Sequence, residues 1–200
     1  MFGPVGSGKS TFSVMLANKL GWSCISADMV VHQMLDQATT QLILTKYFGT
    51  QIVHNDGTIN KTVLGNLVFR DHPSLNLLER ILWPMIEERL KTVTRRNLSN
   101  NNGTIIDAAV LISARWHKIC DKIIYIDAKK NVRQQRLRDK GIEDSRIFML
   151  MSAQEKILKQ KKRADVIIQN NKSLLDLEKQ ITKLVLKWIP TIPSKEMEAQ

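Results

Sequence analysis

The 200-residue sequence has few cysteines, few aromatic residues and no long apolar run. Its two cysteines, Cys24 and Cys120, lie far apart without the spacing of a disulfide framework or a zinc site, and we expect both to be small buried apolar residues. No apolar run approaches the roughly 18 residues of a membrane-spanning helix, and no signal peptide precedes the first glycines. These absences favour a cytoplasmic protein without a membrane partner.

Acidic residues are also scarce, since 19 Asp and Glu stand against 30 Lys and Arg, a formal net charge of +11. Such a charge indicates an anionic partner or a solvated basic surface. The chain has no zinc-finger spacing and no aromatic–basic RNA signature, and its 6% of aromatic residues leave little for stacking on bases. ATP and a second polyphosphate substrate account for the charge without nucleic acid.

A phosphate-binding loop is present in GPVGSGKS (3–10), which fits G-x-x-x-x-G-K-[ST] without a mismatch. Glycines let the backbone curl so that its N–H groups converge on phosphate oxygens, and the following helix adds its positive N-terminal end. Lys9 would reach the β- and γ-phosphates, and the Ser10 hydroxyl would bind Mg²⁺. An ordinary glycine-rich turn before a helix is the alternative, but such turns rarely carry the full motif. We assign ATP to Gly3, Gly6, Ser7, Gly8, Lys9, Ser10 and Thr11.

Only Met1 and Phe2 precede this loop, although a phosphate loop normally follows a complete buried strand. We expect either a truncated first strand, with about four to six residues missing upstream, or a stub that replaces the strand.

Alternating strand and helix patterns predict an α/β fold of the P-loop NTPase type, with a parallel sheet covered by helices on both faces. Strands are expected at 22–26, at the start of 104–112, at 121–128 and at 164–171, and helices at 11–20, 130–140, 145–162 and 174–188. Residues 29–98 show helical periodicity without a convincing strand, with helices near 61–70, 74–82 and 85–97 and an N-cap at Asn60.

These patterns divide the chain into a nucleotide-binding core and a helical insert. The core comprises residues 1–28 and 99–189, with a small lid near 129–150. The insert comprises residues 29–98, and residues 190–200 form a polar, proline-broken tail that we expect to be flexible.

Two carboxylates follow predicted strands, at the edge where open α/β sheets bind ligands. Asp28 leaves the strand at 22–26, where a general base beside the phosphates would have to be. It could instead cap the helix that begins near residue 29. Asp107 ends the strand at 104, where it could hold Mg²⁺ through water or cap a helix.

The chain resembles the dephospho-CoA kinase family over nearly its whole length. Besides the loop, SADMVVH (26–32) is similar to the family's D-A-D-x-x-x-H, and DGTINKTVLGNLVF (56–69) to its D-G-x-(I/L)-x-R-x-x-L-x-x-x-V-F. YIDA with Arg136 resembles the strand and lid, and ADVIIQNN (164–171) resembles A-D-x-(V/I)-I-x-N-N. The resemblance implies ATP-dependent phosphorylation of the ribose 3′-hydroxyl of dephospho-CoA, the final step of coenzyme A synthesis, with the insert forming much of the acceptor site.

The resemblance also implies residue roles. Asp28 matches the general base, and Arg136 matches the lid arginine that closes over the transferring phosphate, with Arg133 and Arg138 as alternative candidates. Their basic segment is also typical of a solvated helix face. His32 and Lys61 match acceptor-binding positions. Asn170 matches a position that lines the adenine pocket, and a turn asparagine is the alternative.

The chain departs from the family pattern mainly in the acceptor segments. Ser26 replaces the first Asp of D-A-D, Lys61 replaces an arginine, and Trp83 replaces the histidine of His-Pro. Lysine keeps the charge but loses a bidentate contact, and an indole cannot exchange a proton. These changes bear on acceptor binding rather than on nucleotide binding.

Three other functions stay open on the sequence alone. The chain could be another small-molecule kinase of the nucleoside-monophosphate type, a catalytically weak nucleotide-binding switch, or a basic nucleic-acid binder. A substrate panel separates the first, absent turnover despite ATP binding favours the second, and steep salt dependence marks the third.

Overall fold

The computed structural model describes residues 1–100 and 102–188. Within them the chain divides into two units. The core unit comprises residues 1–24 and 102–188, and the helical unit comprises residues 25–100. The tail predicted at 190–200 lies outside the described residues.

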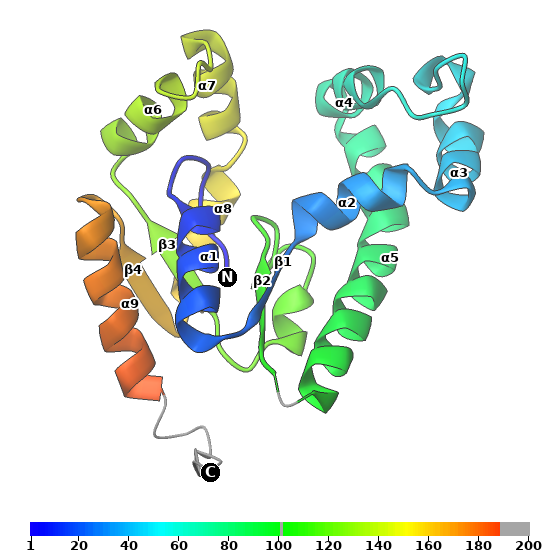
Figure 1. Ribbon diagram of the computed structural model, residues 1–200. Coiled ribbons are helices and arrows are strands. Elements are labelled where there is room, and N and C mark those ends of the chain that lie inside the picture. Colours follow the sequence, from blue (N-terminus) through cyan, green and yellow to red (C-terminus); the bar gives the residue numbers. More distant parts are fainter. Residues whose placement is uncertain (101, 189–200) are drawn as a thin grey trace. The chain divides into compact units, whose positions relative to one another are not determined.

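Short apolar strands form the sheet region of the protein (Figure 1). Strand β1 (Ser23–Ser26) lies beside β2 (Thr104–Asp107), and β3 (Ile124–Asp127) pairs in parallel with β4 (Val166–Gln169). In the second pair Ile124 lies opposite Val166 and Asp127 opposite Gln169. The four predicted strands are therefore confirmed, each shorter than its apolar segment.

Met1 and Phe2 occupy the place of a strand between the two pairs. The Phe2 amide donates to the carbonyl of Ile124 (3.0 Å), and the Ile126 amide donates to the carbonyl of Phe2 (2.9 Å). On the other side, the Ala108 amide donates to the carbonyl of Met1 (3.1 Å). These two residues thus pair with the chain on both sides, and the phosphate loop follows them directly.

Helices α1 (Lys9–Leu20) and α9 (Leu174–Trp188) pack against each other on one face of the sheet (Figure 1). Their buried side chains share one core with alternate residues of the strands, including Phe12, Leu16, Leu177, Ile181, Ile124, Ile126 and Ile168. Because side chains alternate along a strand, Tyr125 faces the opposite side. There, Lys161 of the short 3₁₀ helix η3 (Gln160–Arg163) lies 5.9 Å from the centre of its ring. The sheet is covered on both faces, as predicted.

The remaining elements of the core unit are η2 (Trp116–Ile119), α6 (Lys130–Arg138), α7 (Asp144–Ser152) and α8 (Glu155–Lys159). The single helix predicted at 145–162 is wrong, because the chain turns between α7 and α8. Gln154 has φ −103° and ψ 14°, outside helical geometry. Neither glycine nor proline marks this turn, so the sequence pattern runs through it.

The helical unit contains α2 (Ala27–Leu35), α3 (Ala38–Phe48), η1 (Thr50–Ile52), α4 (Lys61–Arg70) and α5 (His72–Ser99). Helices α2 and α4 pack along α5 (Figure 1). Asn60 caps α4, as predicted, by accepting a hydrogen bond from the Val63 amide (3.0 Å).

Helix α5 is continuous, so the two helices predicted at 74–82 and 85–97 are wrong. The prediction ended the first helix before Pro84, which lies inside α5. A proline removes one intrahelical hydrogen bond and crowds the preceding turn. Leu82, Ile86 and Leu90 are buried along one stripe of α5, before and after Pro84. Their packing keeps the turns on both sides of the proline helical.

The expectation that both cysteines are buried is wrong for Cys24 and met only in part for Cys120. Cys24 is exposed on β1, whereas Cys120 is partly buried, and both are free. Within residues 1–100 and 102–188, no helix is both long and apolar enough to cross a membrane.

Helix α9 offers a matched test of the core. Leu177 is 1% exposed and Leu175 is 61% exposed on the same helix. We expect Leu177→Ala to lower the free energy of unfolding by about 2–5 kcal/mol, because it removes buried methyl groups and leaves a cavity. Leu175→Ala should change it by about 0.5 kcal/mol or less. Urea denaturation followed by circular dichroism measures both, and equal losses would contradict this packing.

Candidate active site

The phosphate loop is held by close contacts that leave no room for side chains. A Cβ at Gly3 would lie 2.3 Å from the carbonyl oxygen of Ile126, and one at Gly8 would lie 2.3 Å from Nδ2 of Asn170. At Gly6 the nearest atom would be the carbonyl oxygen of Arg133, at 2.8 Å. Gly6 and Gly8 also have φ of 75° and 87°, which other residues rarely adopt. The glycines therefore allow the loop backbone to curl, and their lack of a Cβ also allows the loop to lie this close to its neighbours.

The loop leads into the N-terminus of α1. Gly8 occupies the N-cap position without a capping side chain, and Lys9 is the first helical residue. The first amides of a helix have no intrahelical acceptor and form a ready anion site. Ser10 and Thr11 lie exposed in this turn, whereas the Ser7 hydroxyl is buried without a hydrogen-bond partner in the described part of the chain. This arrangement can bind phosphate groups.

Two predicted metal-site residues lie together. The Ser10 hydroxyl donates to Oδ2 of Asp107 over 2.8 Å, and Asp107 is 6% exposed at the end of β2. A hydroxyl and a carboxylate oxygen are hard ligands of the type that Mg²⁺ prefers, and Mg²⁺ in kinases keeps several waters beside such ligands. The donor set therefore fits the ion that the sequence suggested.

Arg136 and Asn170 meet at the outer side of the loop. The Asn170 amide donates to the carbonyl of Ser7 (2.8 Å), and Asn170 is 5% exposed. Arg136 places Nη1 3.4 Å from the Ser7 carbonyl and Nη2 3.3 Å from Oδ1 of Asn170. Burial lowers the pKa of Arg136, but a guanidinium stays charged at any physiological pH. Arg138, in contrast, is exposed and pairs with Asp144 (2.7 Å).

The site also contains buried charge at Arg133, an alternative candidate to Arg136 in the sequence. Arg133 is 6% exposed, its Nε has no hydrogen-bond partner within the described residues, and burial lowers its pKa. Burial likewise raises the pKa of Tyr125 to about 12. Asp127 ends β3 and binds Lys161 (2.6 Å). A strand-end carboxylate is the same signal that identified Asp107, and it could have identified Asp127.

The predicted general base and the residues predicted to bind the acceptor lie in the helical unit. Asp28 is exposed in the first turn of α2, and Ser26 is the N-cap, accepting from the Met29 amide (3.4 Å). The alternative that Asp28 caps this helix is therefore wrong. His32 follows Asp28 by four residues, which places both on one face of the helix.

Lys61 links this face of α2 to α4. Its Nζ lies 3.2 Å from Nδ1 of His32 and 3.1 Å from Oδ1 of Asp36. Because an ammonium group only donates, Nδ1 of His32 can take part in this contact only as the acceptor. Asp36 was not predicted, although the spacing of Asp28, His32 and Asp36 by four residues could have indicated it.

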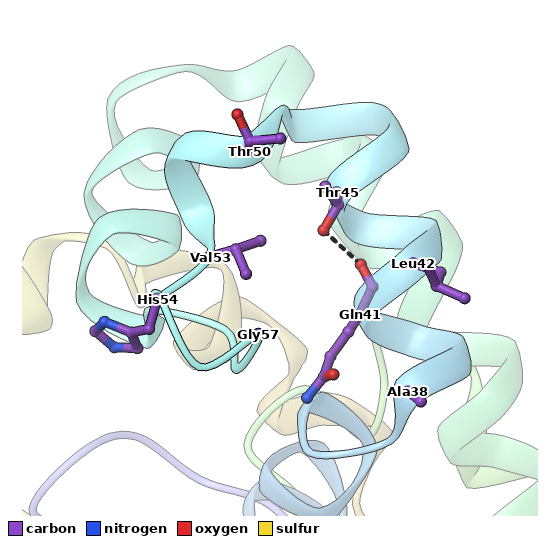
Figure 2. Close-up of a pocket in the computed structure, with 8 residues that line it drawn as sticks. All are labelled: Ala38, Gln41, Leu42, Thr45, Thr50, Val53, His54 and Gly57. Carbon is purple, nitrogen blue, oxygen red and sulfur yellow. Dashed lines mark hydrogen bonds between the residues drawn. The ribbon is translucent and has the colours of Figure 1, made fainter.

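The helical unit also has an open groove of about 490 Å³ between α3 and the segment 50–57 (Figure 2). Its lining is formed by Ala38, Gln41, Leu42, Thr45, Thr50, Val53, His54 and Gly57. The Thr45 hydroxyl there donates to the Gln41 carbonyl (2.7 Å), so it is already satisfied within the helix. None of the predicted site residues lines this groove.

A parallel α/β fold whose first loop carries G-x-x-x-x-G-K-S onto a helix N-terminus, with a strand-end carboxylate on the loop serine, defines a P-loop kinase. Solved structures agree on the fold. A Thermus thermophilus protein gives a TM-score of 0.78 at 22% identity, covering 93% of this chain and 94% of that one. A dephospho-CoA kinase from Campylobacter jejuni gives a TM-score of 0.68 at 23% identity, covering 95% of each.

The particular family follows from the sequence matches. The family model for dephospho-CoA kinase matches residues 1–176. The dephospho-CoA kinase of Borreliella burgdorferi is 33% identical over 186 residues, covering 90% of this chain and 89% of that one. The chain belongs to the dephospho-CoA kinase family, and it is an ATP-using kinase.

Two glycines with the same backbone angle test the loop contacts. Gly6 and Gly141 both have φ of 75°, but a Cβ at Gly141 would meet nothing within 4 Å. Both alanine variants carry the strain of left-handed backbone, about 1–2 kcal/mol. Only Gly6→Ala also pushes the loop away from α6, so we expect it to weaken ATP binding by more than about tenfold, roughly 1.4 kcal/mol.

Calorimetric titration with ATP measures this difference, and thermal unfolding shows that both variants are folded. Similar ATP affinities for the two variants would contradict the claim that contact with α6 shapes the loop.

Proposed function

We propose that the chain transfers the γ-phosphoryl group of ATP to the ribose 3′-hydroxyl of dephospho-CoA, giving coenzyme A and ADP, the last step of coenzyme A biosynthesis. Family membership supports the substrate pair. The observation that carries the chemistry is the set of contacts around the phosphate loop, where Ser10 binds Asp107 and Arg136 lies on the loop carbonyls. We further propose that the reaction takes place in the cytoplasm, where ATP is supplied.

The nucleotide side of the reaction is assigned to the core unit. Lys9 and the amides of the loop hold the β- and γ-phosphates, and Asn170 borders the adenine. Arg136 neutralises charge that develops on the transferring group. Its present contacts to loop carbonyls are 3.4–3.5 Å long, so little is lost when its guanidinium turns to phosphate oxygens.

Ser10 and Asp107 would hold Mg²⁺, directly or through water. When bound there, the ion would neutralise negative charge on the nucleotide phosphates and so favour departure of ADP. The short bond between these two side chains supports this assignment, because it brings a hydroxyl and a buried carboxylate to one point at the loop.

The acceptor side is assigned to the helical unit. Asp28 accepts the proton of the 3′-hydroxyl as that oxygen attacks the γ-phosphorus, while the bond from phosphorus to the β-phosphate oxygen breaks and ADP leaves. The exposure of Asp28 supports this role, because a base must be reachable by substrate. Lys61 supplies positive charge to the acceptor phosphates, and His32 binds them beside it.

The direct experiment incubates the protein with ATP, Mg²⁺ and dephospho-CoA, and measures by mass spectrometry whether dephospho-CoA gains one phosphate. Matched reactions contain EDTA in place of Mg²⁺, or Lys9→Ala in place of the unaltered chain, and both should give no product. Phosphate on a different hydroxyl acceptor in a parallel panel would make the chain another small-molecule kinase. Tight ATP binding with no product on any acceptor would make it a nucleotide switch.

Asp28→Asn tests the general base. Asparagine keeps the size and much of the hydrogen bonding but cannot take a proton, so we expect kcat to fall by roughly 10²- to 10⁴-fold, with both KM values nearly unchanged. A loose transition state places the loss toward the lower end of that range.

The matched control for this variant is Glu88→Gln, which removes an exposed negative charge from α5 of the same unit. Its kcat should match that of the unaltered enzyme. Near-normal turnover of Asp28→Asn at saturating substrates would remove Asp28 from the mechanism.

A further inference from the structure

One amide of the phosphate loop is held by a distant side chain. The Val5 amide donates to Oε1 of Gln154 over 2.5 Å, a contact between residues 149 positions apart. Pro4, the preceding residue, has no amide proton, and the Ser7 amide donates to the Pro4 carbonyl (3.2 Å). The first half of the loop is thus held by protein groups.

Gln154 lies in the turn between α7 and α8, at the N-cap position of α8. Its side chain makes no capping hydrogen bond to that helix. A local role at the helix end therefore does not explain the contact. The side chain is directed to the loop instead.

The chain that follows Gln154 is anchored to the rest of the core unit. Ile157 is 6% exposed, Gln160 donates to the Ser113 hydroxyl (3.0 Å), and Lys161 pairs with Asp127 (2.6 Å). The chain before Gln154 is α7, which packs on α6, the helix that carries Arg136. Gln154 therefore connects the phosphate loop to two parts of the chain, the anchored residues 157–161 that follow it and the helices at 130–152 that precede it.

A loop rich in glycine loses much conformational freedom when it is ordered. A hydrogen bond made before the ligand arrives reduces the part of this loss that falls on binding. The Val5 amide is suited to this task, because it lies beside Gly6, where the loop touches α6.

We infer that Gln154 is a positioning residue for the nucleotide, whose side-chain carbonyl holds the first half of the phosphate loop in its binding shape. It acts on the phosphates through the Val5 amide. The inference rests on the use of ATP by the chain and not on the identity of the acceptor, so ATP binding alone tests it.

Two variants separate the hydrogen bond from the volume of the side chain. Gln154→Met keeps the length of the side chain but removes the oxygen acceptor, and we expect it to raise the Kd for ATP by about tenfold. At saturating ATP its kcat should stay within about twofold, because the lost contact is equal in the ground and transition states. Gln160→Met is the control, since Gln160 is in the same segment and binds Ser113 instead.

Gln154→Glu keeps an acceptor for the Val5 amide but adds negative charge beside the loop. It should weaken ATP more than ADP, because ATP carries one more negative charge, and added salt should reduce this difference. A side chain at position 154 that lay away from the loop would leave both affinities, and their salt dependence, unchanged.

Hydrogen exchange of the unaltered protein gives a measurement that needs no variant. The Val5 amide should be protected in the absence of nucleotide. Rapid exchange of that amide overturns the inference, and so does a folded Gln154→Met variant with normal ATP affinity, or an equal loss in Gln160→Met. Product formation from dephospho-CoA is measured separately, so failure here is distinct from failure of the proposed reaction.

Discussion

The nucleotide site depends on the close approach of the loop backbone to three other parts of the core unit. The carbonyl of Ile126, the backbone of α6 at Arg133 and the side chain of Asn170 each lie where a Cβ of the loop would stand. The loop backbone cannot move any closer to these neighbours. Its curled shape is therefore fixed by tertiary contacts as well as by the backbone angles that glycine permits. The same contacts require the strands and α6 to be in place before the loop has its shape.

This constraint also accounts for the position of Arg136. Gly6 rests on α6 at Arg133, and Arg136 follows by three residues, on the same face of the helix. The guanidinium of Arg136 therefore reaches the carbonyls of Gly6 and Ser7 directly from the helix. In the sequence, the basic residues of α6 resemble one solvated helix face. The packing of the helix on the loop separates them into two groups. One side carries Arg133 and Arg136 against the loop, and the other carries exposed Arg138.

The sequence predicts those parts that local chemistry determines. Strands follow from apolar runs, α1 from its motif and from Gly21, and the start of α4 from Asn60, because each signal acts within a few residues. The sequence does not predict those parts of the structure that depend on contacts between distant residues. Burial holds α5 together through Pro84, and the turn at Gln154 has no local marker. The sequence could assign Ser10 and Asp107 separately by type, but the bond between them spans 97 positions and only the fold brings it about.

The electrostatics of the core unit follow from its need to hold a polyanion. Within the described residues, neither Arg133 nor Arg136 forms an ion pair with a carboxylate, although both are partly desolvated and burial lowers both pKa values. Partners for these cations would stabilise the free protein but would also repel phosphate. Lys161 has such a partner in Asp127, on the face of β3 away from α1 and α9. Of these three cations, the two beside the phosphate loop have no carboxylate partner in the described part of the chain, and Lys161 has one, on the other face of the sheet. Unpaired positive charge beside the loop suits a small anionic ligand there.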